Sequence, residues 1–263
     1  LSILPDGYRC CRANVHHLSI SKEVFLIQMS FIMNIIQRNL FTKLRIDNFQ
    51  TKEQLEPMSR FKMKKLMVLM KNIADMPAGE VTLSNPLLNK RLKNIQKEEA
   101  TATQVSKETI YLLRIIIANV NATMNHGIPV RGIIQLGQYL RSRGEKVDFM
   151  KLEQWLSKLH VSRLAQLQGN ILIDLLGFEK AELPFVKQPE KEAISLTLRS
   201  ITNIEHDTEE WHFRQGNSVF VHNNQKLLRR NLRRSMRYID YAPIETTSNF
   251  LLNFSRSLSE IEE

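Results

Sequence analysis

Cysteine, glycine and proline are all scarce in this sequence. The two cysteines, Cys10 and Cys11, are adjacent, and the chain holds no other thiol that could bridge either of them. A disulfide framework is therefore excluded, which favours a reducing compartment. Nine glycines and eight prolines in 263 residues are few for a fold with many turns, so the composition favours helices over β structure.

Long hydrophobic runs are missing as well. The most apolar window, Val24–Ile36, is 13 residues long, whereas a membrane-spanning helix needs about 20 residues. Residues 37–39, Gln-Arg-Asn, do not supply the small-residue cleavage site that would follow a signal peptide. We therefore expect a core or docking helix in this window, no membrane span and a cytoplasmic protein.

The common catalytic signatures are also absent. The sequence contains no Walker-type phosphate loop, no dinucleotide-binding glycine pattern and no nucleophile elbow. Four side chains are of types that bind zinc, but their spacing matches no standard zinc pattern and no cysteine joins them: His206, Asp207, His212 and His222. We expect no metal and no other cofactor, and we assign no enzyme activity.

The sequence does contain, from His126 to Phe178, a helical stretch with clear signals for where helices begin and end. Gly127 and Pro129 break the preceding apolar run, Gly144 ends a first helix, and Asp148 is a good N-cap for a second. A third helix follows almost at once. The short joints predict one compact bundle. Its expected core residues recur with a helical period: Val130, Ile133, Ile134, Leu136, Leu140, Phe149, Leu152, Trp155, Leu156, Leu159, Leu164, Leu167, Ile171, Leu172, Leu175 and Leu176.

Two further helices are predicted before this bundle. Residues Glu108–Met124 are apolar on most sides, so we expect a largely buried helix. Thr51 begins a segment with capping-box spacing that predicts a basic amphipathic helix ending before Pro77. We interpret its apolar side as a core stripe beside a solvated lysine face, rather than as a membrane or nucleic-acid surface. That stripe comprises Phe61, Leu66, Leu69, Met70 and Ile73.

The bundle carries a family resemblance. The run HGIPVRGIIQLGQYLRSRGEKVDFMKLEQWLSKLHVSRLAQLQGNILIDLLG resembles the helical region of a bacterial family of uncharacterised nucleotidyltransferases. The shared features are a His-Gly turn, an arginine at a helix start, an Asp-aromatic cap and a helix ending in Leu-Gly. The resemblance covers about residues 107–185 and implies a helical module of that family.

The catalytic half of such an enzyme is not recognisable. A nucleotidyltransferase needs a Gly-Ser turn for the nucleotide phosphates and two carboxylates, one residue apart on a strand, for magnesium. The sequence has no Gly-Ser pair and no Asp-x-Asp. The nearest match is Glu205, Asp207 and Glu209, in polar surroundings and without a preceding glycine-rich turn. An active magnesium-dependent nucleotidyltransferase using these three residues is the alternative to a noncatalytic protein.

The sharpest electrostatic feature is a basic run near the end of the chain. The net charge is +10, and residues 226–237 hold six cations and no anion at one helical stripe: Lys226, Arg229, Arg230, Arg233, Arg234 and Arg237. Such a row can bind nucleic acid or another polyanion, or a protein partner. The opposing interpretation is a helix that packs through its leucines and pairs its arginines with the acidic 190–210 segment and the acidic tail.

Together these patterns predict a mainly α-helical protein, a multi-helix bundle with one small β hairpin near 211–222. We divide it into an N-terminal segment at 1–50, either a docking helix or not native to the protein, a helical bundle domain at 51–185, and a C-terminal part at 186–263. The expected function is noncatalytic: a nucleotidyltransferase-like helical protein that binds a phosphate-rich or protein partner through the 226–237 stripe.

Overall fold

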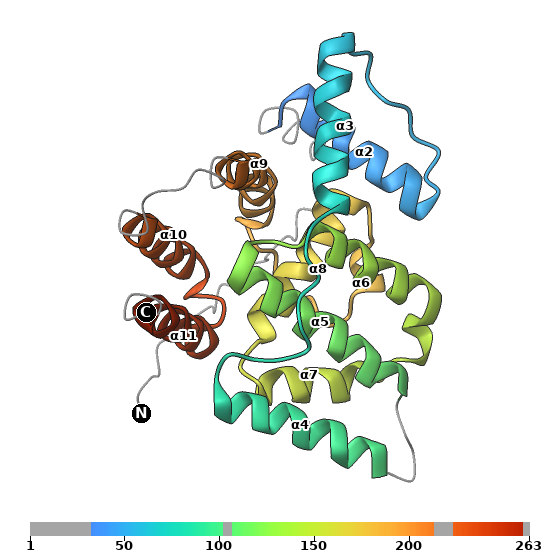
Figure 1. The fold of residues 1–263 in the computed structure, drawn as a ribbon. Helices are drawn as coiled ribbons and strands as arrows, with labels where there is room; N and C mark the ends of the chain where they lie inside the picture. The colour runs from blue at the N-terminus through green and yellow to red at the C-terminus, as the bar shows by residue number, and fades with distance from the viewer. Residues whose placement is uncertain (1–32, 102–106, 213–222, 260–263) are drawn as a thin grey trace, which may run out of the picture. The chain divides into compact units, whose positions relative to one another are not determined.

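Every regular element in the described part of the chain is helical. The computed structural model describes residues 33–101, 107–212 and 223–259, with the backbone only for 203–212, 223–228 and 256–259 (Figure 1). Ten α-helices follow one another: α2 (Ile35–Phe49), α3 (Arg60–Ala74), α4 (Pro86–Thr101), α5 (Lys107–His126), α6 (Val130–Arg143), α7 (Phe149–Lys158), α8 (Ser162–Leu176), α9 (Ala193–His212), α10 (Asn223–Tyr238) and α11 (Pro243–Ser259).

The predicted helical class is therefore confirmed, and these residues contain no strand. The predicted hairpin near 211–222 has its first two residues, Trp211 and His212, at the end of α9. Its remaining residues lie outside the described ranges. No helix in the described part of the chain is long and apolar enough to cross a membrane.

The described residues from Ile35 onward belong to one structural unit. Most of the apolar window that starts at Val24 lies outside the described residues, and its last two residues begin α2. The stretch between α8 and α9, where we placed a domain boundary, packs into this unit. Its buried side chains are Leu183, Phe185 and Val186. The subdivision at 50 and 185 stays a prediction.

Helix α5 is at the centre of this unit. It packs against α6, α7, α8, α10 and α11. Such a position requires apolar residues around most of the helix, and the sequence supplies them. Leu112, Leu113, Ile116, Ile117 and Val120 are fully buried, as the pattern of 108–124 predicted.

The three helices predicted from the 126–178 stretch occur with nearly the expected ends. Gly127 and Gly177 both have positive φ, at 95° and 73°, which glycine adopts at little cost. The Asp148 side chain accepts a hydrogen bond from the backbone N–H of Lys151 at 3.0 Å, which confirms the predicted N-cap. Gly144 follows α6 directly and begins a short 3-10 turn.

The segment before α3 departs from the prediction. Thr51 caps no helix; Ser59 is the N-cap of α3 and accepts from the backbone N–H of Lys62. Residues 51–59 instead run along α2, where Arg38 pairs with Glu56 at 2.7 Å. Nonlocal ion pairs thus override the local capping-box pattern, which carries no information about neighbouring helices.

Helix α3 also buries less of its apolar stripe than expected. Leu66 and Ile73 are buried, whereas Phe61 is 66% exposed. The predicted core stripe is therefore wrong at its first position. Met63, Met67 and Val68 are exposed on the same helix, between its lysines.

Helix α11 buries its polar side and exposes its apolar side, the reverse of a usual amphipathic helix. It packs against α10 and α5, and the side chains it buries are polar: Glu245, Thr246 and Asn249. Hydrogen bonds offset the cost of burying them. Glu245 accepts from the backbone N–H groups of Ser84 and Asn85, the latter at 3.1 Å, next to the start of α4.

The apolar side chains of α11 point the other way. Ile244, Leu251, Leu252 and Phe254 are exposed. Among the described residues, the side of α11 that faces the rest of the unit is thus polar and its opposite side is apolar.

Candidate functional site

The predicted arginine stripe lies on α10, and the structure divides it into two groups. Arg229 and Arg233 are exposed, whereas Arg230, Arg234 and Arg237 are half-buried. The two exposed guanidinium groups lie one helical turn apart. Neither forms an ion pair with a carboxylate among the described side chains. The side chain of the sixth cation, Lys226, is outside the described set.

At least two of the half-buried arginines form hydrogen bonds within the protein. The Arg234 guanidinium donates to the carbonyl oxygen of Asn125, in the last turn of α5, where a cation favours the negative end of the helix dipole. The Nε of Arg237 donates to the carbonyl oxygen of Arg233 at 3.1 Å. The part of the stripe that faces an external partner is therefore Arg229 with Arg233.

Apolar side chains of α10 accompany these two arginines on the surface. Met236 is 67% exposed, and Leu232 and Ile239 are exposed too. The interpretation in which α10 packs through its leucines is wrong for Leu232. Together with the outward side of α11, these residues form what we call the C-terminal face: Arg229, Leu232, Arg233, Met236, Ile239, Ile244, Leu251, Leu252 and Phe254.

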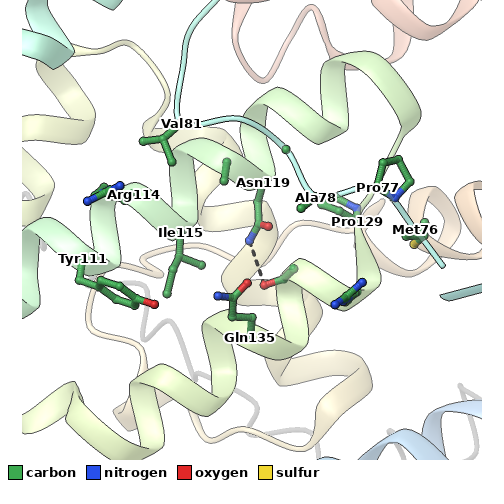
Figure 2. Close-up of a pocket in the computed structure, with 14 residues that line it drawn as sticks. Met76, Pro77, Ala78, Val81, Tyr111, Arg114, Ile115, Asn119, Pro129 and Gln135 are labelled. Atoms are coloured by element: carbon green, nitrogen blue, oxygen red, sulfur yellow. Dashed lines mark hydrogen bonds between the residues drawn. The ribbon is translucent and has the colours of Figure 1, made fainter. Parts of the chain in front are cut away.

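A separate cavity of about 340 Å³ lies between α5, α6 and the segment that follows α3 (Figure 2). Its apolar wall comes from Met76, Pro77, Val81, Ile115 and Pro129. Its polar lining comes from Tyr111, Arg114, Asn119, Arg131 and Gln135, and it includes no carboxylate.

Two glycines allow the walls of the cavity to approach each other. A Cβ on Gly79 would lie 1.8 Å from the carbonyl oxygen of Ala118, and a Cβ on Gly132 would lie 1.9 Å from Oδ1 of Asn119. Both positions therefore exclude any larger residue without a shift of the neighbour.

A buried amide network fixes the floor beside these glycines. Asn119 is only 4% exposed, and its Nδ2 donates to the carbonyl oxygen of Gly132 and to Oε1 of Gln168, both at 3.1 Å. Gln168 in turn donates to the carbonyl oxygen of Ile116 at 3.2 Å. These bonds join α5, α6 and α8, so the floor is rigid.

The two arginines of the cavity have different surroundings. Arg131 donates to the carbonyl oxygen of Ala74 at 2.9 Å, at the end of α3. Arg114 is exposed and makes no ion pair or hydrogen bond with the described residues. The sequence marks Arg131 only as the arginine at a helix start and gives no signal for Arg114, because the lining comes from three segments that only the fold brings together.

The acidic residues of the alternative function lie on α9. Residues 205, 207 and 209 fall within the helix Ala193–His212, whereas the carboxylate pair of a nucleotidyltransferase needs a strand. Their side chains are outside the described set. Among the described side chains, no three of His, Cys, Asp and Glu gather as a metal site would require.

Comparison with known proteins finds no matching family model, no matching curated protein and no matching solved structure. The resemblance of residues 107–185 to the helical region of uncharacterised nucleotidyltransferases therefore stays a prediction.

Proposed function

We propose that this chain is a noncatalytic helical binding protein, nucleotidyltransferase-like in its central bundle, whose C-terminal face binds an acidic amphipathic protein partner. One observation carries the proposal: Arg229 and Arg233 are exposed one turn apart, without a described carboxylate partner, beside exposed Leu232 and Met236. A complementary surface must offer carboxylates and apolar groups together.

This composition favours a protein over a nucleic acid. A nucleic-acid backbone satisfies the arginines with phosphates but leaves adjacent aliphatic side chains in water. Protein interfaces, by contrast, are enriched in arginine and methionine and desolvate an apolar centre within a polar rim. The exposed leucines and Phe254 of α11 extend the apolar area next to α10.

The test measures binding of two fluorescent probes by anisotropy: a synthetic helical peptide with a leucine face bordered by glutamates, and single-stranded RNA. We expect the peptide to bind in a salt-sensitive manner. Arg229→Ala with Arg233→Ala should weaken it by about thirtyfold, since two charged contacts of about 1 kcal/mol each contribute about 2 kcal/mol together. Leu232→Ser with Met236→Ser should weaken it as much.

The matched control is Arg143→Ala with Lys146→Ala, which removes two exposed cations elsewhere and changes the net charge equally. This variant should retain the affinity of the parent chain. Binding of RNA that depends on the arginines but not on Leu232 and Met236 would overturn the protein-partner proposal in favour of nucleic acid. An equal loss of affinity in the control would show that the effect comes from the change in net charge and not from these two arginines.

A further inference from the structure

We propose that the cavity between α5 and α6 binds a small organic oxyanion, a carboxylate or phosphate attached to an apolar or aromatic body. This site is distinct from the C-terminal face and lies on other helices (Figure 2). At about 340 Å³ its volume is at the lower end of the range of small-molecule sites, about 300–1,000 Å³. A compact metabolite fits such a space; a nucleic acid or a folded partner does not.

The charge of the lining selects an anion. Arg114 and Arg131 are the charged residues that line the cavity, and no carboxylate lies among the lining residues to neutralise them. A guanidinium group presents its N–H donors in a planar fork that matches the two oxygens of a carboxylate or the face of a phosphate. A cationic ligand is repelled by these groups, and a neutral one gains less from them than an anion does.

Arg131 is held in place before a ligand arrives. Its Nη1 donates to the carbonyl oxygen of Ala74, which fixes one edge of the guanidinium and leaves the Nε and Nη2 side for a ligand. Arg114 comes from α5, and Figure 2 shows it at the side of the cavity where Tyr111 and Val81 also lie. Because Arg131 is already oriented, the entropy cost of binding is reduced.

The remaining lining suits the body of the ligand. Ile115 and Met76 are buried apolar side chains in the wall. Tyr111 is half-exposed at the rim, with its ring supported by Tyr139 at a centroid distance of 4.8 Å. A supported ring offers a flat surface on which a planar ligand can stack.

Isothermal titration calorimetry with phenyl phosphate and with benzoate tests the proposal, and benzyl alcohol serves as the uncharged analogue. We expect one-to-one binding of at least one anion in the millimolar range or tighter, and none of the alcohol. The anion that binds tells whether the site prefers phosphate or carboxylate. Arg114→Ala should weaken binding by about tenfold. Arg114 is the better probe because replacing Arg131 also removes the bond to Ala74.

Two variants distinguish binding inside the cavity from attraction of the anion to surface charge. Ala118→Met adds a side chain inside the cavity and leaves both arginines in place, so it should abolish binding. Arg143→Ala removes an exposed arginine of α6 that does not line the cavity, so it should bind like the parent chain. The proposal is overturned if neither anion saturates at millimolar concentration, or if binding survives in both Arg114→Ala and Ala118→Met. Removal of Arg229 and Arg233 should leave this binding unchanged, so the two proposals fail independently.

Discussion

At the scale of single residues, Glu245 is the most consequential side chain outside the candidate sites. It is fully buried, yet it accepts from two backbone N–H groups beside the start of α4. Ser84 and Asn85 lie just before α4, and Oδ1 of Asn85 accepts from the backbone N–H groups of the first turn of that helix. The Glu245 carboxylate therefore holds the capping residue in place, near the positive end of the helix dipole. Glu245 has a structural role.

Glu245→Ala should lower the free energy of unfolding by about 2 kcal/mol, because it leaves two part-buried donors without their acceptor. Glu245→Gln keeps one acceptor oxygen and should cost less. Chemical denaturation followed by circular dichroism measures both. The exposed Glu179→Ala serves as a comparison, and an equally small effect of all three substitutions would contradict this role.

At the scale of elements, the sequence predicts some helices well and others only in outline. The limits of α6, α7 and α8 follow from local signals, namely the cap at Asp148 and the glycines at 127, 144 and 177. These signals act within a few residues, so the sequence alone contains them. The spacing of the cations at 226–237 also predicts a helix, and these residues lie within α10.

What the sequence did not reveal is which side of a helix turns inward. The apolar side of α11 faces outward, because hydrogen bonds fix the polar side of this helix inward. Glu245 accepts from the backbone N–H groups of Ser84 and Asn85, and Nδ2 of Asn249 donates to Oγ of Ser84. Periodicity marks two sides of a helix but not their partners. For the same reason the cavity, built from three separate segments, was not foreseen.

The close packing of α5 gives a prediction at this scale. Gly79→Ala should lower the free energy of unfolding by about 2 kcal/mol, because its Cβ would collide with a backbone oxygen of Ala118 that cannot rotate away. Gly144→Ala is the matched control: no atom lies near its Cβ and its φ is −54°. It should be neutral or stabilise by about 0.5 kcal/mol. Equal thermal stability of the two variants would contradict the argument.

At the scale of the whole molecule, stability should depend on pH through the half-buried carboxyl group of Asp174. Burial raises the pKa of the Asp174 carboxyl on α8 to about 6. In the unfolded chain its pKa is about 4. Between these values the folded state holds a proton that the unfolded state has lost, so stability falls as pH rises from about 4 to about 6 and then levels off.

Asp174→Asn should remove this decrease of stability with rising pH, because the amide does not titrate. We expect the variant to be more stable than the parent chain at pH 7, by up to about 3 kcal/mol, and to differ little from it at pH 4. Denaturation midpoints across this pH range measure the effect, with the exposed Asp240→Asn as control. Parallel pH profiles for the parent chain and Asp174→Asn would be inconsistent with this assignment.

The bond from Glu245 to the start of α4 also bears on how the chain is synthesised. The amides of Ser84 and Asn85 leave the ribosome about 160 residues before their acceptor, which at ordinary translation rates is a delay on the order of ten seconds. Throughout that delay water must occupy the place of the carboxylate. The unit from Ile35 onward therefore completes its fold only after residue 245 has emerged, and a chaperone that shields nascent chains has that interval in which to act.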